Sequence, residues 1–170
     1  MDAFLKRAGR VLRAAADEAL KPESFVKGEE FENYVRKYIF PLELYTLKHK
    51  THGYTDNKND YDDESREPDY IFISKKTKRE FHLEVKFRSH FYDNAVKWCK
   101  GYQFKRYHEY DKECPVFILL GVEGTPENPE NLFLFPLRKV KYTKLFRSIL
   151  ERYQIPLDKP YPESKLWKLI

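Results

Sequence analysis

Residues 80–88 read EFHLEVKFR, an alternation of polar and apolar side chains without an exception. A period of two is the pattern of a β-strand, because neighbouring side chains of a strand point to opposite faces of its sheet. We therefore expect a strand here, with one face toward the core and the other toward a polar cleft or solvent. The core face would carry Phe81, Leu83, Val85 and Phe87, and the polar face His82, Glu84, Lys86 and Arg88.

The residues before this strand predict a helix and two further strands. Apolar and aromatic residues repeat at helical spacing over 23–40, and Pro41 ends the helix. Strands are expected at 42–52 and 69–74. Residues 53–67, between these two strands, are polar and acidic and indicate a loop.

The residues after this strand predict a second helix, two more strands and a last helix. These elements are expected at about 94–110, at 116–122 and 132–137, and at 140–153. A loop rich in Gly, Pro and Asn would join the two strands. The remaining tail contains three prolines and is expected to lie over the surface.

These elements predict one α/β domain over residues 1–170, with a central mixed β-sheet flanked by helices on both faces. The core would span about 23–137, with an amphipathic basic helix at 2–20 and the helix at 140–153 as additions. A chain of 170 residues with 41% hydrophobic content is long enough to bury a core.

The net charge of +5 weakly favours polyanionic partners. Two cysteines provide no disulfide framework, and no apolar run approaches the length that spans a membrane. We therefore expect a cytoplasmic protein that does not associate with membranes.

The pair Glu84 and Lys86 is the first candidate for chemistry, because residues two apart on a strand share one face. Asp69 begins the preceding strand, and a hairpin would bring its carboxylate beside Glu84. Two carboxylates suit Mg²⁺, which keeps much of its water shell. Lys86 would then orient the attacking water or help to deprotonate it. The alternative is an ordinary cross-strand ion pair in solvent.

The sequence Pro68-Asp69 followed by Glu84-Val85-Lys86 resembles the PD-(D/E)XK nuclease superfamily. This superfamily includes many restriction enzymes, archaeal Holliday-junction resolvases and RecB-type exonucleases. The order of elements, α-β-β-β-α-β, is that of the family's restriction-endonuclease-like core. The resemblance spans about residues 27–122.

Two further motifs support the resemblance. Residues 27–32 look like the resolvase-type opening, in which the Glu four residues after the Gly is functional; this indicates Glu32, with Glu29 as the alternative. Residues 103–107, QFKRY, are similar to the Gln-x-x-x-Tyr motif of RecB-type members. Gln103 and Tyr107 share a helix face and would contact the phosphate backbone or hold the catalytic lysine.

The resemblance implies a nuclease that depends on Mg²⁺ or Mn²⁺. The catalytic residues that it implies are Asp69, Glu84, Lys86 and Glu32. The implied metal ligands are Asp69, Glu84, Glu32 and the backbone carbonyl of Val85. Many small members act as dimers, so a homodimer through the helix at 2–20 is one option for the assembly.

Basic and aromatic residues interleave on and after the strand at 80–88, a composition that suits a nucleic-acid surface. Arg88, Lys105 and Arg106 are the candidate contacts, with Gln103 and Tyr107, and His82 is expected to share the cleft face with Arg88 and Glu84. The alternative for each is a solvated helix face over an aromatic core. His49, His52, Cys99 and Cys114 lack the spacing of a zinc finger or ribbon.

The function that we expect is hydrolysis of phosphodiester bonds in DNA. No separate target-recognition domain is evident, which favours a structure-specific nuclease or one of low sequence specificity. The alternative is a non-catalytic module, on a nuclease-like fold, that binds nucleic acid or a protein. The presence of Asp69, Glu84 and Lys86 together favours the enzyme. The sequence leaves open DNA versus RNA and endonuclease versus exonuclease.

Overall fold

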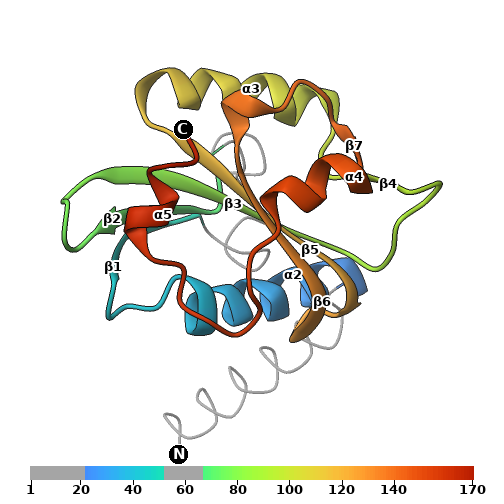
Figure 1. Ribbon diagram of the computed structural model, residues 1–170, viewed down its shortest axis with the longest axis horizontal. Coiled ribbons are helices and arrows are strands. Elements are labelled where there is room, and N and C mark those ends of the chain that lie inside the picture. The colour runs from blue at the N-terminus through green and yellow to red at the C-terminus, as the bar shows by residue number, and fades with distance from the viewer. Residues whose placement is uncertain (1–21, 52–66) are drawn as a thin grey trace, which may run out of the picture.

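A five-stranded mixed sheet forms the centre of the computed structural model, which describes residues 22–51 and 67–170 (Figure 1). The strands, in the order in which they neighbour one another, are β1 (Tyr45–Lys50), β2 (Tyr70–Ser74), β3 (Glu80–Arg88), β5 (Val116–Thr125) and β6 (Asn128–Pro136). β3 and β5 are parallel, and the other neighbouring pairs are antiparallel. The prediction of an α/β fold with a central mixed sheet is therefore confirmed.

Helices cover the sheet on both faces; Figure 1 shows α2 below the strands and α3 above them. One face packs against α2 (Glu23–Tyr34), a π-helical turn (Val35–Ile39) and α5 (Glu163–Leu166). The other face packs against α3 (Gly101–Glu113), the ribbon of β4 (Ala95–Lys97) and β7 (Lys144–Phe146), and α4 (Arg147–Leu150). Short 3₁₀ turns occupy Leu137–Lys139 and Glu151–Tyr153.

Because both faces are covered, neither face of β3 is a solvent face, and this corrects one prediction. Phe81, Leu83 and Val85 pack in the core between the sheet and α2, as the alternation predicts. His82 and Glu84, expected in a polar cleft or solvent, are 7% and 1% exposed. The sequence pattern showed correctly that the two sets point apart. α3 covers His82 and Glu84, whereas Lys86 and Arg88 stay partly exposed.

Gly121 in β5 allows α2 to approach the sheet closely. A Cβ atom at this position would lie 2.5 Å from the Phe31 ring, far inside van der Waals contact. The Phe31 ring in turn packs against Phe87 of β3, with 5.6 Å between the ring centroids. The missing side chain therefore fixes the distance between α2 and the sheet, and with it the position of Glu32.

Two predicted helices are wrong in part. Residues 94–100, expected to begin a helix, instead form β4 and a connection, and α3 begins only at Gly101. A tight turn explains this, because Asp93 and Asn94 have φ angles of 49° and 54° and Tyr92 exchanges backbone hydrogen bonds with Ala95.

The helix expected at 140–153 is a short strand followed by two helical turns, and Tyr142 and Phe146 are exposed. The strand β7 forms because Leu145 pairs with Val96 across the ribbon, a contact that local spacing cannot reveal.

Two connections near the C-terminus also differ from the prediction. β5 and β6 extend into the expected Gly, Pro and Asn-rich loop and form a tight hairpin in which Thr125 pairs with Asn128. The proline-containing tail does more than lie over the surface, since Leu166 is fully buried and Trp167 packs on Phe81 and Phe117.

The helix predicted at 2–20 and most of the loop predicted at 53–67 lie outside the described residues. Within the described residues, no helix is both long and apolar enough to cross a membrane.

Candidate active site

Asp69 lies where the hairpin of β2 and β3 comes apart. The paired residues of the two strands end at Tyr70 and Leu83. Asp69 is the residue before Tyr70, and its side chain replaces a backbone carbonyl as the acceptor. Its Oδ2 accepts a hydrogen bond from the backbone N–H of Val85 at 2.8 Å. The backbone N–H of Asp69 donates in turn to Glu84 Oε2 at 3.2 Å. The hairpin therefore brings Asp69 and Glu84 together, as the sequence predicted.

The Glu84 carboxylate is buried and held by three donors. Its Oε2 accepts the backbone N–H of Asp69, while its Oε1 accepts the Tyr107 hydroxyl at 2.5 Å and the Lys86 ammonium. A carboxylate withdrawn from water needs such partners, since an unpaired buried charge is very costly. Glu84 is thus held in one orientation, with Lys86 and Tyr107 beside it.

The electrostatics of the site follow from burial and from neighbouring carboxylates. Burial, the negative charge of Glu84 and that of Glu32 raise the pKa of Asp69 well above its usual range, against the opposing effect of Lys86. Burial alone would lower the pKa of Lys86, but Glu84 and Asp69 outweigh it and raise it. Lys86 is therefore an ammonium at neutral pH. A divalent cation at this position would offset the effect of the Glu84 charge on Asp69.

Glu32 reaches the same region from α2, but it contacts a different pair of residues. Its Oε2 accepts the Tyr70 hydroxyl at 2.7 Å and forms an ion pair with the Lys50 ammonium at 3.0 Å. The negative charge of Glu32 contributes to the raised pKa of Asp69, which places the two carboxylates in one electrostatic neighbourhood. Within the part of the chain that the structure describes, no three or more His, Cys, Asp or Glu side chains form a group that could hold a metal.

A cleft of about 890 Å³ opens beside these residues. It runs from α2 past the ends of β1 and β3 to β4 and the start of α3, and Asp69, Lys86 and Glu32 line it. Among the described residues that line the cleft, four are acidic, Glu23, Glu29, Glu32 and Asp69, and six are basic: Lys27, Lys50, Lys86, Arg88, Lys97 and Lys100. Positive charge along a cleft attracts phosphate groups and concentrates them near the carboxylates.

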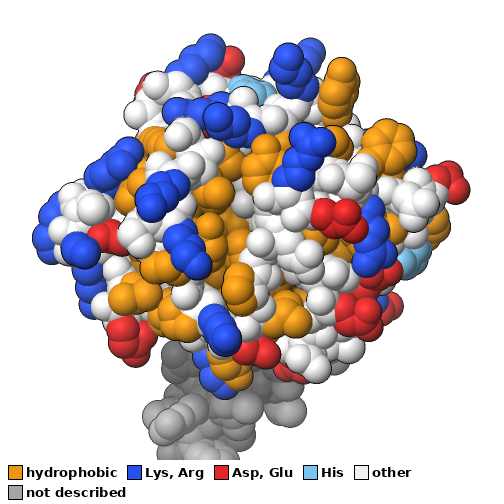
Figure 2. Space-filling view, in the orientation of Figure 1, with side chains coloured by type: hydrophobic (Ala, Val, Ile, Leu, Met, Phe, Trp, Pro, Cys, Tyr) orange, Lys and Arg blue, Asp and Glu red, His pale blue; other side chains and the backbone are white. Residues whose placement is uncertain are grey.

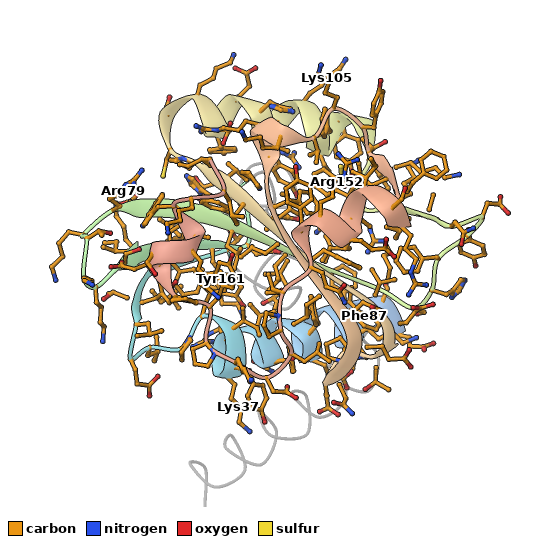
Figure 3. The ribbon with its side chains drawn as sticks, in the orientation of Figure 1. Lys37, Arg79, Phe87, Lys105, Arg152 and Tyr161 are labelled. Carbon is orange, nitrogen blue, oxygen red and sulfur yellow. The ribbon has the colours of Figure 1, made fainter. Side chains whose placement is uncertain are left out.

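The predicted residues on α3 do not share one role. The Gln103 side chain lines the cleft and accepts the N–H of Lys100, which caps the helix. Tyr107 is buried and bonds Glu84, so it does not reach a phosphate backbone and holds the glutamate rather than the lysine. Lys105 points outward from α3 (Figure 3), and the Arg106 guanidinium lies 5.7 Å from the centre of the Tyr102 ring.

Arg88 lines the cleft but also fixes the backbone beside it. Its guanidinium donates to the carbonyls of Phe87 at 2.7 Å, of Lys97 at 2.9 Å and of Trp98 at 2.7 Å. Burial lowers the pKa of Arg88, and the negative charge of Glu84 acts in the opposite direction by favouring the charged guanidinium. Its predicted contact with phosphate is therefore secondary to a structural role at the end of β3.

His82 and Cys114 lie away from the cleft, whereas Cys99 lines it. His82 is buried against the Tyr110 ring, so the expectation that it faces the cleft is wrong. Cys99 and Cys114 are free thiols, and burial raises the pKa of Cys99 to about 12. Among the described residues, neither cysteine belongs to a metal-binding group.

Sequence reasoning missed two residues of this region, Lys50 and Tyr70. Lys50 ends β1 and Tyr70 begins β2, and the two residues pair with each other across the strands. The Lys50 ammonium also lies 5.6 Å from the centre of the Tyr70 ring. The pairing of Lys50 with Tyr70 could have been predicted from the alternation of the two strands. Their contacts with Glu32 could not, because these depend on how α2 packs against the sheet.

Comparison with known proteins adds a likeness of fold. A Holliday junction resolvase from the hyperthermophilic archaeon Archaeoglobus fulgidus has a similar solved structure. The TM-score is 0.49 at 14% identity, over 76% of this chain and 90% of the resolvase. No family model and no curated protein matches the chain. The residue roles that follow therefore rest on the geometry of the site.

Proposed function

We propose that this chain is a metal-dependent nuclease that hydrolyses phosphodiester bonds in DNA, with specificity for DNA structure or with little sequence specificity. The observation that carries the proposal is the meeting of Asp69, Glu84 and Lys86 where β2 and β3 separate. Asp69 and Lys86 line the cleft, and Glu84 is buried beside them. Carboxylates without cations would repel a polyanion. Beside six basic residues, they have the arrangement of a site that brings a cation to a phosphate.

The donor set fits Mg²⁺ or Mn²⁺. Asp69 and Glu84 supply carboxylate oxygens, and the Val85 carbonyl and Glu32 are the further candidate ligands. Mg²⁺ takes few protein ligands and keeps several waters, so two adjacent carboxylates suffice to hold it. When bound, the ion would acidify a water and neutralise the charge that develops on the phosphate.

The protein groups around the ion would each have one task. Lys86, as an ammonium, would donate to a phosphate oxygen or orient the attacking water rather than deprotonate it. Tyr107 would keep the Glu84 carboxylate oriented, because it is a buried partner that fixes the direction of the ligand. The cleft lysines would hold the DNA backbone.

The test is cleavage of four-way-junction, duplex and single-stranded DNA with Mg²⁺, Mn²⁺ or EDTA. We expect metal-dependent cutting that Asp69→Asn and Lys86→Met each lower at least a hundredfold, as is typical when a group that stabilises the transition state is removed. Lys139→Met, an exposed lysine of the Leu137–Lys139 turn, is the matched control and should keep full activity.

Two other outcomes have clear meanings. Cutting that persists in both Asp69→Asn and Lys86→Met would refute the site. Tight DNA binding without cutting in any metal would instead indicate the second candidate, a non-catalytic binding module. The ion pair between Lys86 and Glu84 is the observation that favours this candidate, because it satisfies the carboxylate without a cation. Whether the chain acts as a homodimer stays a prediction.

A further inference from the structure

The outer face of the β4–β7 ribbon carries two lysines directly opposite each other. Val96 and Leu145 pair across the ribbon and are buried, so this pair faces the core. The next pair, Lys97 and Lys144, points outward and is exposed. Like charges directly opposite each other destabilise an antiparallel pair. Neither ammonium has an ion-pair partner among the described residues, so the ribbon retains a repulsion that a bound anion would relieve.

Exposed aromatic residues flank Lys144 in the chain, and Phe146 shares its face of β7. Tyr142 and Phe146 each lie two residues from Lys144, and they are 70% and 58% exposed. A hydrogen bond from the Trp98 N–H to the Thr143 carbonyl continues the ribbon back toward Tyr142. Figure 2 shows hydrophobic and basic side chains side by side over the part of the molecule where Figure 1 places β4 and β7. Tyr142, Lys144 and Phe146 thus place an aromatic ring, an ammonium and a second ring in succession along this segment.

This face is continuous with the candidate active site. Lys97 lines the same cleft as Asp69 and Lys86. The Arg88 guanidinium, at the end of the strand that carries Lys86, binds the carbonyl of Lys97 at 2.9 Å. The ribbon therefore holds a fixed position relative to the site, and a strand bound on it would extend into the cleft.

We propose that the outer face of the ribbon binds a single-stranded segment of DNA, with phosphates at Lys97 and Lys144 and bases stacked on Tyr142 and Phe146. The proposal rests on the proposed function and names its substrate class: duplex DNA with an adjoining unpaired strand. Bases within a duplex stack on one another, whereas unpaired bases offer their faces to aromatic side chains. Lysines alone would bind the phosphates of a duplex as well as those of a single strand. The exposed rings favour an unpaired strand, because only its bases are free to stack on them.

The experiment measures binding by fluorescence anisotropy in EDTA, so that no cutting occurs. The probes are a labelled duplex with a single-stranded overhang and the matching blunt duplex. Tyr142→Ala/Phe146→Ala should weaken binding of the overhang probe at least about fivefold, the lower end of the effect of losing a base–aromatic stack, and leave the blunt probe unchanged.

The lysine pair is tested through the salt dependence of binding. Lys97→Gln/Lys144→Gln should reduce the slope of log K against log salt for the overhang probe by about 1.4, since each phosphate contact on a single strand contributes about 0.7. The same variant should unfold at an equal or higher temperature, because it removes a repulsion. Lys165→Gln/Lys168→Gln on and after α5 removes equal charge elsewhere and is the control.

The outcomes separate this inference from the proposed function. A Tyr142→Ala/Phe146→Ala variant that binds the overhang probe as tightly as the wild type, or that loses overhang and blunt probes equally, would overturn the inference. An unchanged salt slope for the overhang probe in Lys97→Gln/Lys144→Gln would overturn it as well. Absence of metal-dependent cutting by the wild type would overturn the proposed function while leaving the binding comparison intact.

Discussion

Replacing Tyr107 with phenylalanine removes a single hydroxyl from the interior and keeps the ring. That hydroxyl donates to Glu84 Oε1 at 2.5 Å, and the two residues are 3% and 1% exposed. A hydrogen bond to a charged group contributes about 1.5–3 kcal/mol. The Lys86 ammonium remains on the same oxygen in the variant, so we expect the lower end, about 1.5–2 kcal/mol.

This loss is measurable by thermal and urea unfolding in EDTA. For a chain of this size it corresponds to a fall in Tm of about 3–8 °C. A second readout follows if Glu84 binds a metal, because loss of the group that orients a ligand costs about 10–100-fold in metal affinity. Titration of Mn²⁺ against the Tm of wild type and variant would measure it.

Tyr92→Phe is the matched control, since Tyr92 is 68% exposed and its hydroxyl loss should change stability by less than about 0.5 kcal/mol. The reasoning fails if Tyr107→Phe destabilises the protein no more than Tyr92→Phe does. It fails for the metal site if the stability falls as expected while the affinity for Mn²⁺ stays at the wild-type value.

Three further predictions follow from other contacts. The pKa of Asp69 is raised in the folded state, so the folded chain keeps a proton that the unfolded chain loses near pH 4. Proton binding by Asp69 therefore contributes to stability at low pH, and this contribution is lost as pH rises through the folded-state pKa. Asp69→Asn should therefore raise the Tm in EDTA at pH 7 and flatten its fall with pH; a lower Tm at pH 7 would contradict this. Gly121→Ala should cost about 1–3 kcal/mol by urea unfolding, because the new methyl group meets the Phe31 ring, and an unchanged midpoint would refute that packing. Adding Mg²⁺ or Mn²⁺ should raise the Tm of the wild type but not of Asp69→Asn, and an equal rise in both would place the ion elsewhere.

The parts of the fold that were predictable are those encoded over short distances. β3 alternates over nine residues, and β2 is a short apolar run separated from it by a five-residue turn, so a hairpin was the simple solution. The misassigned segments are those that long-range contacts decide. Residues 144–146 form a strand because residues 95–97 pair with them, and the period of their own side chains fits a helix equally well.

The candidate site divides in the same way. Asp69, Glu84 and Lys86 could be chosen from sequence because a hairpin and a two-residue spacing bring them together whatever else the chain does. Lys50 could not, since its contact with Glu32 joins the end of β1 to α2. The pairing of the Tyr107 hydroxyl with Glu84 likewise depends on a helix that follows the strand by a crossover.

The sequence by itself determined which side chains share a strand face and which can bind a cation or a phosphate, because both properties depend on residue type and local spacing. Only the tertiary structure decided what surrounds them. β3 lies between two other strands of the sheet and beneath α3, so the Glu84 carboxylate expected in an open cleft is buried. In that position it needs Tyr107 and Lys86 as partners, since a charge withdrawn from water is stable only when it is paired.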